Sequence, residues 1–283
     1  MPLRLWHLAS LDAPTVAIVW ALAFAWVCRV RFPLWVAAVL ASIVWATYVS
    51  DRLLDARRAI ARKEENRLRE RHFFHWRWRR VLAPAALAAA LGAACLVFLE
   101  MPRASFVRGS IVAAAAVAYL SGVHFRSARR QQPSRPAMPY GTRRKSSRLF
   151  TKELAVGVLF AAGCALPAWN RSPSPAAGFL LAVGFFAALA WLNCVAIERW
   201  EDAARKGNGS GIARPACILG ACAASAALAS TAHSPRESAL MFACAVAAFL
   251  LAALDRLRHR MTPLALRAAA DLVLLTPLGL LWP

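Results

Sequence analysis

Long runs of apolar residues alternate with short polar stretches along the whole chain. The segments 82–100 (LAPAALAAALGAACLVFLE) and 239–254 (ALMFACAVAAFLLAAL) are apolar on every side of a helix. A helix that packs on a soluble core keeps one polar face, whereas about 20 apolar residues cross a bilayer as a helix. Backbone polar groups find no partners in lipid, so such runs are predicted to be helical. The pattern therefore predicts an all-α, polytopic membrane protein.

The runs predict nine transmembrane helices in a single domain that covers residues 1–283. No cleavable signal peptide is expected, because the first apolar run lacks an A-x-A-like exit. The predicted spans are 11–30, 33–50, 81–99, 106–125, 152–169, 175–197, 212–232, 237–254 and 264–282. The longest connections follow the second, fourth, sixth and eighth spans and cover 51–80, 126–151, 198–211 and 255–263.

The charges predict how this bundle is oriented. The chain is 60% hydrophobic and carries a formal net charge of +21. Eleven Lys and Arg residues lie in 51–80 and nine in 126–152, whereas the connections on the opposite side hold six in total. Cytoplasmic loops collect Lys and Arg, so the N-terminus and the long loops are predicted to be cytoplasmic, in a multi-pass protein of the inner (plasma) membrane. Topology and anionic lipid explain the basic residues, and no nucleic-acid partner is expected.

The acidic residues are few, and five of the fourteen gather at two places. Asp51 and Asp55 follow the second span in TYVSDRLLDARR, and Glu198 and Asp202 follow the sixth in ERWED. Residues four apart share one helix face, where like charges are mildly destabilising unless a cation lies between them. Mg²⁺ binds one or two carboxylates together with substrate phosphate oxygens. The alternative is that these are ordinary loop-edge charges balanced by the arginines beside them, but their repetition after corresponding spans favours a diphosphate site.

These motifs resemble those of the UbiA superfamily of intramembrane prenyltransferases. The first family motif reads approximately N-D-x-x-D-R-x-x-D, and TYVSDRLLD is similar to its latter half at Asp51, Arg52 and Asp55, with Thr47 at the position of the Asn. ERWED resembles the second motif, D-x-x-x-D, with Glu in place of the first Asp. The segment 152–167 (KELAVGVLFAAGCALP) resembles the start of the fifth helix, where the family has a Lys that contacts diphosphate.

The resemblance implies a nine-helix fold and Mg²⁺-dependent transfer of a prenyl group from a prenyl diphosphate to an aromatic or other lipid-soluble acceptor. The missing Asn and leading Asp place the chain among divergent members. The implied catalytic and metal-binding residues are Asp51, Asp55, Glu198 and Asp202. The candidate substrate-binding residues are Thr47, Arg52, Lys152, Asn193, Glu201 and Tyr119.

Two of these candidates come from their position inside spans. Asn193 is a polar residue at membrane depth in the sixth span and is a candidate for lining the acceptor cavity; an interhelical hydrogen bond is the alternative. Tyr119, near the end of the fourth span, is a second candidate. Cations such as Arg52 and Lys152 would neutralise the departing diphosphate, and the allylic carbocation would react with the acceptor away from water.

Other function classes stay open. One UbiA branch transfers a phosphoribosyl-type sugar phosphate to a lipid phosphate, and the sequence does not separate the donors. A non-catalytic carrier or scaffold of the same fold is the other alternative. Transporters often show inverted repeats and midplane sites, whereas this chain has no convincing repeat and its carboxylates lie at one surface.

Two further groups of polar residues are interpreted as structural rather than functional. His72 and His75, in RHFFHWRWRR, belong to a basic and aromatic stretch that is typical of an interfacial anchor, with metal binding as the alternative. Arg267 and Asp271 are four apart in the ninth span, where charge is a functional hypothesis by default. Because each supplies the other's partner, they are predicted to form a structural ion pair.

Overall fold

The computed structural model describes residues 2–61, 70–129, 144–172, 177–206 and 209–281, with side chains except at 2–3, 119–129, 144–151 and 204–206. Within these ranges the chain forms helices joined by turns, so the all-α prediction is confirmed. The helices are α1 (Pro2–Leu8), α2 (Asp12–Val27), α3 (Leu34–Ala61), α4 (Glu70–Arg77), α5 (Arg79–Glu100), α6 (Arg103–Arg129), α7 (Arg144–Trp169), α8 (Ala177–Lys206), α9 (Ala213–Ser230), α10 (Pro235–Leu257), the 3₁₀ turn η2 (Arg258–Arg260), α11 (Pro263–Val273) and α12 (Leu278–Leu281).

Six helices among the described residues are long and apolar enough to cross a membrane, which supports a multi-pass protein in a lipid bilayer. They are α3, α5, the Lys152–Trp169 part of α7, α8, α9 and α10. α2 is a shorter apolar helix. The predicted ninth span is interrupted: α11 ends at Val273, and the chain turns before the four-residue α12. Pro277 lies in this turn, where its missing N–H and ring disfavour a continuous helix. The predicted count of nine spans is not confirmed.

The helices α3 and α8 extend beyond their predicted ends. α3 continues to Ala61 instead of ending at 50, and α8 continues to Lys206 instead of 197. Arg and Ala, which follow both apolar runs, are good helix formers and allow this extension. Both acidic motifs therefore lie on helices, where residues four apart share a face.

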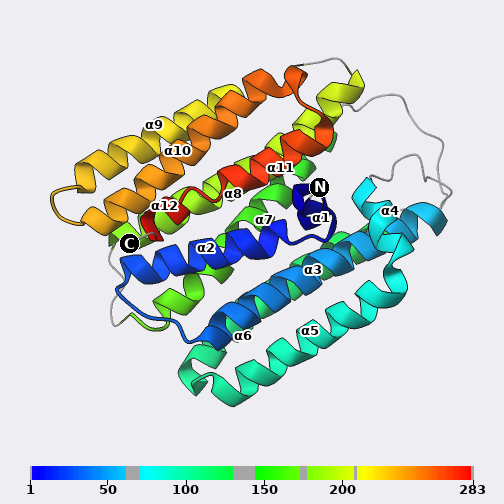
Figure 1. Cartoon of the computed structure of the whole chain (residues 1–283), viewed down its shortest axis with the longest axis horizontal. Helices are drawn as coiled ribbons and strands as arrows, with labels where there is room; N and C mark the ends of the chain where they lie inside the picture. The colour runs from blue at the N-terminus through cyan, green and yellow to red at the C-terminus, as the bar shows by residue number, and fades with distance from the viewer. Residues whose placement is uncertain (1, 62–69, 130–143, 173–176, 207–208, 282–283) are drawn as a thin grey trace.

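The helix ends that carry the acidic motifs lie toward the same end of the bundle. α3, α8 and α10 end, and α5, α9 and α11 begin, toward the right-hand side of Figure 1, and α1 lies there too. The C-terminal helix α12 lies toward the opposite end. The predicted grouping of the four long connections and their cytoplasmic orientation stay predictions.

The core is formed by α2, α7, α8 and α10. Trp20 and Phe24 of α2 are fully buried against Phe186 of α8 and Leu240 of α10. The Trp20 and Phe186 rings stack with centroids 3.8 Å apart. Such aromatic pairs contribute about 0.5–1.5 kcal/mol beyond the area that they bury. The Trp20 indole also donates a hydrogen bond to the carbonyl of Leu274 (2.8 Å), which joins the first long helix to the last.

The contact between α7 and α8 depends on a glycine. A Cβ at Gly157 would lie 2.7 Å from the backbone nitrogen of Trp191 and 2.8 Å from the carbonyl oxygen of Ala187. Small residues let helices approach closely in membranes. This contact fixes the α7 backbone against α8 within a few residues of Lys152 and Glu153.

By contrast, α5 packs mainly on α3 and has few buried residues. Ala86 and Ala93 are its buried side chains. Leu87, Leu91 and Phe98 are exposed. In a bilayer these side chains face lipid, which is as apolar as they are.

Candidate functional site

A turn between α1 and α2 covers the end of the bundle where the acidic motifs lie. α1 packs on α4 and α11. The Trp45 indole of α3 donates a hydrogen bond to the carbonyl of Ala9 (2.9 Å), which ties the turn to α3. Ser10, in the same turn, has φ 56°, a left-handed conformation that non-glycine residues rarely adopt. Such a conformation costs about 1–3 kcal/mol and persists only where surrounding contacts fix it.

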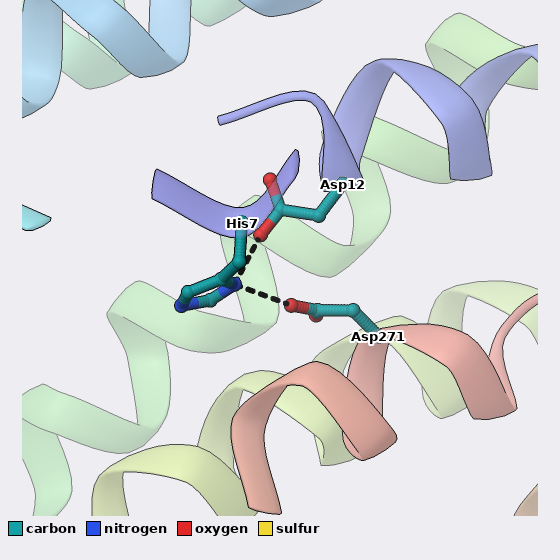
Figure 2. A group of neighbouring side chains, drawn as sticks. All are labelled: His7, Asp12 and Asp271. Carbon is teal, nitrogen blue, oxygen red and sulfur yellow. Dashed lines mark ion pairs between the residues drawn. The ribbon is translucent and has the colours of Figure 1, made fainter. Parts of the chain in front are cut away.

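Three side chains, one each from α1, α2 and α11, meet inside the protein (Figure 2). His7 Nδ1 lies 3.0 Å from Asp12 Oδ2 and 3.7 Å from Asp271 Oδ2. The side chains are 2%, 11% and 16% exposed, respectively. One ligand atom from each residue lies within 4.8 Å of the others, as a metal ion requires. We refer to these three residues as the His7 cluster.

Amide groups hold the other oxygen of each carboxylate in the His7 cluster. Asp12 Oδ1 accepts a hydrogen bond from the backbone N–H of Ala13 (3.0 Å). Asp271 Oδ1 lies 3.5 Å from Asn193 Nδ2 of α8, a long contact. Asn193 is buried, and its own Oδ1 has no hydrogen-bond partner. Asn193 therefore lies beside Asp271, within the bundle, as its position at membrane depth predicts.

His75 of α4 is a buried neighbour of the cluster. It is fully buried, its Nδ1–H donates to the carbonyl of Arg71 (2.7 Å), and its Nε2 lies 3.4 Å from the Ser10 hydroxyl. Burial lowers the pKa of His75, and the cations Arg52 and Arg71 lower it further. His72 is buried as well. The basic and aromatic stretch thus turns both histidines inward.

The first acidic motif begins with an ion pair between neighbours. Arg52 Nη1 lies 2.9 Å from Asp51 Oδ2, and its guanidinium lies 5.5 Å from the centre of the Tyr48 ring. The Arg52 Nε is buried without a hydrogen-bond partner. Asp55 and Thr47, on the same helix, are half-buried. The motif therefore combines a cation with half-buried carboxylates.

Charged residues of α3 and α7 interact electrostatically with α8. Arg52, Lys152 and Glu153 all act electrostatically on Cys194. One turn further along α8, Glu198 interacts with Glu153 of α7. One oxygen of Glu153, Oε2, is buried without a hydrogen-bond partner. Two carboxyls that interact inside a protein favour a shared proton or a nearby cation.

The second motif is partly engaged in holding the last helix. Glu201 forms an ion pair with Arg267 of α11. The predicted pair between Arg267 and Asp271 is therefore wrong: Arg267 reaches α8, and Asp271 faces His7. The two residues are neighbours on one helix, but each finds its partner on another element. Asp202, the last acid of the motif, is half-buried on α8.

Tyr119, a predicted substrate-binding residue, lies outside the described side chains. The predicted convergence of Asp51, Asp55, Glu198 and Asp202 stays a prediction. Three residues were missed by the sequence reasoning: His7, Asp12 and Glu153. A polar pair directly before the first apolar run, HLASLD, was a signal for the first two.

A second buried carboxylate, Asp255 of α10, has a different environment. It accepts hydrogen bonds from the Trp200 indole (2.7 Å), the backbone N–H of Ala213 (2.7 Å) and the Ser210 hydroxyl. Arg258 lies 3.4 Å away. These contacts join α8, α9 and α10, so Asp255 has a structural role.

Comparisons with protein-family models, with curated proteins and with solved structures find no match for this chain.

Proposed function

We propose that this chain is an intramembrane transferase that moves a prenyl group from a prenyl diphosphate to an aromatic or other hydrophobic acceptor, with Mg²⁺. The proposal extends the UbiA resemblance of the acidic motifs. One observation supports it: Arg52 of α3 and Lys152 of α7 act on the same point of α8, one turn before Glu198. A diphosphate needs cations on several sides, and two helices supply them here.

The donor set fits Mg²⁺. The carboxylates proposed to hold it are Asp51 and Asp55 on α3 and Glu198 and Asp202 on α8, all half-buried. Carboxylate oxygens are ligands that Mg²⁺ prefers, together with water and phosphate oxygens. Glu153 adds a buried oxygen without a hydrogen bond. When bound, Mg²⁺ supplies positive charge to the leaving diphosphate.

Within the proposed reaction, the residues of the chain act through charge. The bond between the allylic carbon and the diphosphate oxygen breaks, and the oxygen keeps the electron pair. Arg52 and Lys152 stabilise the negative charge that develops on this oxygen. The allylic carbocation forms a new bond with a nucleophilic carbon of the acceptor, which then loses a proton to the released diphosphate. The apolar helices around the site exclude water from the carbocation.

The test is a transfer assay with the protein reconstituted in liposomes. Labelled prenyl diphosphates of several chain lengths are supplied with a panel of aromatic acceptors, with Mg²⁺ or with a chelator. The proposal expects a lipid-extractable product and released diphosphate that depend on Mg²⁺. Asp55→Asn should lose most of this activity, whereas Glu100→Gln, at the exposed end of α5, should keep it. A carrier would move the diphosphate across the membrane and consume none, which would overturn the proposal.

A further inference from the structure

We propose that the His7 cluster is a binding site for a divalent transition-metal ion, with Zn²⁺ as the best-fitting chemistry. The three protein ligands are His7 Nδ1, Asp12 Oδ2 and Asp271 Oδ2. The site is separate from the carboxylates assigned to Mg²⁺, and the inference does not rest on the proposed transferase activity.

The distances in the cluster are those between ligands that share one ion. Metal bonds of about 2.1 Å place two ligand atoms about 3.0 Å apart at a right angle and about 3.4 Å apart at a tetrahedral angle. The nitrogen-to-oxygen distances in the cluster are 3.0 and 3.7 Å. The two carboxylate oxygens lie within 4.8 Å of each other, so all three atoms fit around a single centre after small adjustments.

The direction of the His7 ring supports an ion over a hydrogen bond. His7 Nδ1 is buried and lies 3.0 Å from Asp12 Oδ2, yet its alignment with either carboxylate is too poor for a good hydrogen bond. The carboxylate oxygens thus lie beside the in-plane axis of the nitrogen. In a metal site the ion occupies that axis and the other ligands lie to its sides. Figure 2 shows both carboxylates directed toward the same side of the ring.

Each carboxylate is oriented as in a metal site. The oxygen that does not face His7 is held by an amide: Ala13 N–H for Asp12 and the Asn193 side chain for Asp271. Hydrogen bonds of this kind orient metal ligands and tune their affinity. The unpartnered Oδ1 of Asn193, in the same buried region, is a further polar atom for which the protein alone offers no partner.

Charge balance favours a doubly charged ion. Two carboxylates buried together repel each other in a medium of low dielectric constant. A neutral imidazole, two carboxylates and one divalent ion add to zero charge. The cation Arg71 also acts on Asp271, but it lies outside the cluster. A mixed set of one imidazole and two carboxylates suits Zn²⁺, Fe²⁺ or Mn²⁺, whereas Mg²⁺ prefers oxygen ligands alone.

The ion would fasten three elements together. His7 belongs to α1, Asp12 begins α2, and Asp271 lies on α11. Three protein ligands leave at least one coordination position open, as in catalytic rather than structural zinc sites. The site could therefore bind water or an anionic ligand while it holds the N-terminal turn on the last long helix.

The test uses full-length protein purified without chelators and with an affinity tag that contains no polyhistidine. Metal content is measured by mass spectrometry, and the stripped protein is then titrated with Co²⁺ while its visible absorption is recorded. We expect one transition-metal ion per chain, a Co²⁺ band displaced by Zn²⁺, and a higher unfolding temperature with Zn²⁺, since an ion that binds the folded state stabilises it.

Variants separate this site from other ligands. Asp271→Asn and His7→Gln should lose the ion and the Co²⁺ band. Asn193→Ala, which removes only an orienting contact, should weaken affinity about 10- to 100-fold. Asp55→Asn, in the proposed Mg²⁺ site, should bind Zn²⁺ like wild type and so serves as the control.

A wild-type protein that holds no ion and gives no Co²⁺ band would overturn the inference, as would a band that survives in Asp271→Asn. If His7→Gln fails to fold, the graded loss in Asn193→Ala still decides the question. Absence of Mg²⁺-dependent prenyl transfer, by contrast, would count against the proposed function alone.

Discussion

Two buried aspartates in this protein have opposite environments. Asp255 accepts hydrogen bonds from an indole, a backbone N–H and a hydroxyl, and an arginine lies 3.4 Å away. Asp271 has two long contacts, at 3.5 Å to an amide and 3.7 Å to His7, and it faces a second carboxylate.

The difference separates a structural carboxylate from one that is prepared for a ligand. A buried charge is stable when every lone pair has a partner. Asp255 meets this condition with donors from the protein, whereas Asp271 has long contacts to Asn193 and His7 and a second carboxyl, that of Asp12, as its neighbour. The same contrast holds between Asp255 and Glu153, whose Oε2 is buried without a hydrogen bond.

The largest expected effect is at Asp255. Asp255→Asn should lower the free energy of unfolding by about 2–4 kcal/mol, because it removes charge-assisted hydrogen bonds and turns two acceptor oxygens into one. Thermal unfolding of the purified protein in detergent measures this. Glu100→Gln, an exposed carboxylate, should change stability by less than about 0.5 kcal/mol. An Asp255→Asn variant as stable as wild type would remove the contrast.

A somewhat smaller effect is expected at the α7–α8 contact, which sets the position of Glu153. Gly157→Ala should destabilise by about 1–3 kcal/mol, because the added Cβ meets α8 backbone atoms and the helices must separate. Gly163→Ala is the matched control on the same helix, where a Cβ meets nothing within 4 Å. It should be neutral or slightly stabilising, since Ala favours helix more than Gly. Equal effects in both variants would show that the contact is not tight.

The pH dependence of stability tests the environment of His75, the buried histidine next to the His7 cluster. Burial lowers its pKa, so the unfolded chain binds a proton at higher pH than the folded protein does. The resulting stability is fully present above about pH 6.5 and is lost as the pH falls below that value, with a slope of at most about 1.4 kcal/mol per pH unit. The measurement is the unfolding temperature of wild type between pH 7.5 and 5, compared with His75→Phe. The variant should show a weaker pH dependence, and identical curves would contradict the assignment.

The smallest effect on stability is expected at Asp271. The same Asp→Asn substitution is made there as at Asp255, so the two buried aspartates are compared directly. In the presence of a chelator, Asp271→Asn should change the unfolding free energy by less than about 1 kcal/mol or stabilise the protein. It weakens the long contacts to His7 and Asn193, keeps a group that can hydrogen-bond to Asp12, and relieves the repulsion between the two carboxylates. Denaturant titration of stripped protein measures this. A loss as large as that of Asp255→Asn would show that Asp271 is a structural residue.

The sequence predicted those features that depend on neighbours along the chain. The apolar runs predicted helices because lipid leaves the backbone few alternatives. The spacing of Asp51 and Asp55 predicted a shared face, and this holds because α3 continues through both residues. The predicted ninth span differs because Pro277 interrupts it.

Contacts between distant segments were not predictable in the same way. Arg267 and Asp271 are four residues apart, and helical spacing alone favours a local pair. Their partners, Glu201 and His7, are selected by the packing of α11 against α8 and α1. Glu153 became a candidate only because it interacts with Glu198 on another helix. A single sequence does not indicate which charged residues meet in the fold. By charge alone, any of its few acidic residues is an equally good partner for any of its many basic residues.

The hydrogen bond from Trp20 to Leu274 has a consequence for biosynthesis. α1 and α2 leave the ribosome before α11, which emerges only after the intervening helices, so these two helices wait for their partner during insertion. His7 and Asp12 meet Asp271 at the same late step. We expect the N-terminal turn of a nascent chain to stay open to proteases until α11 has docked, which makes its closure a marker of a completed bundle.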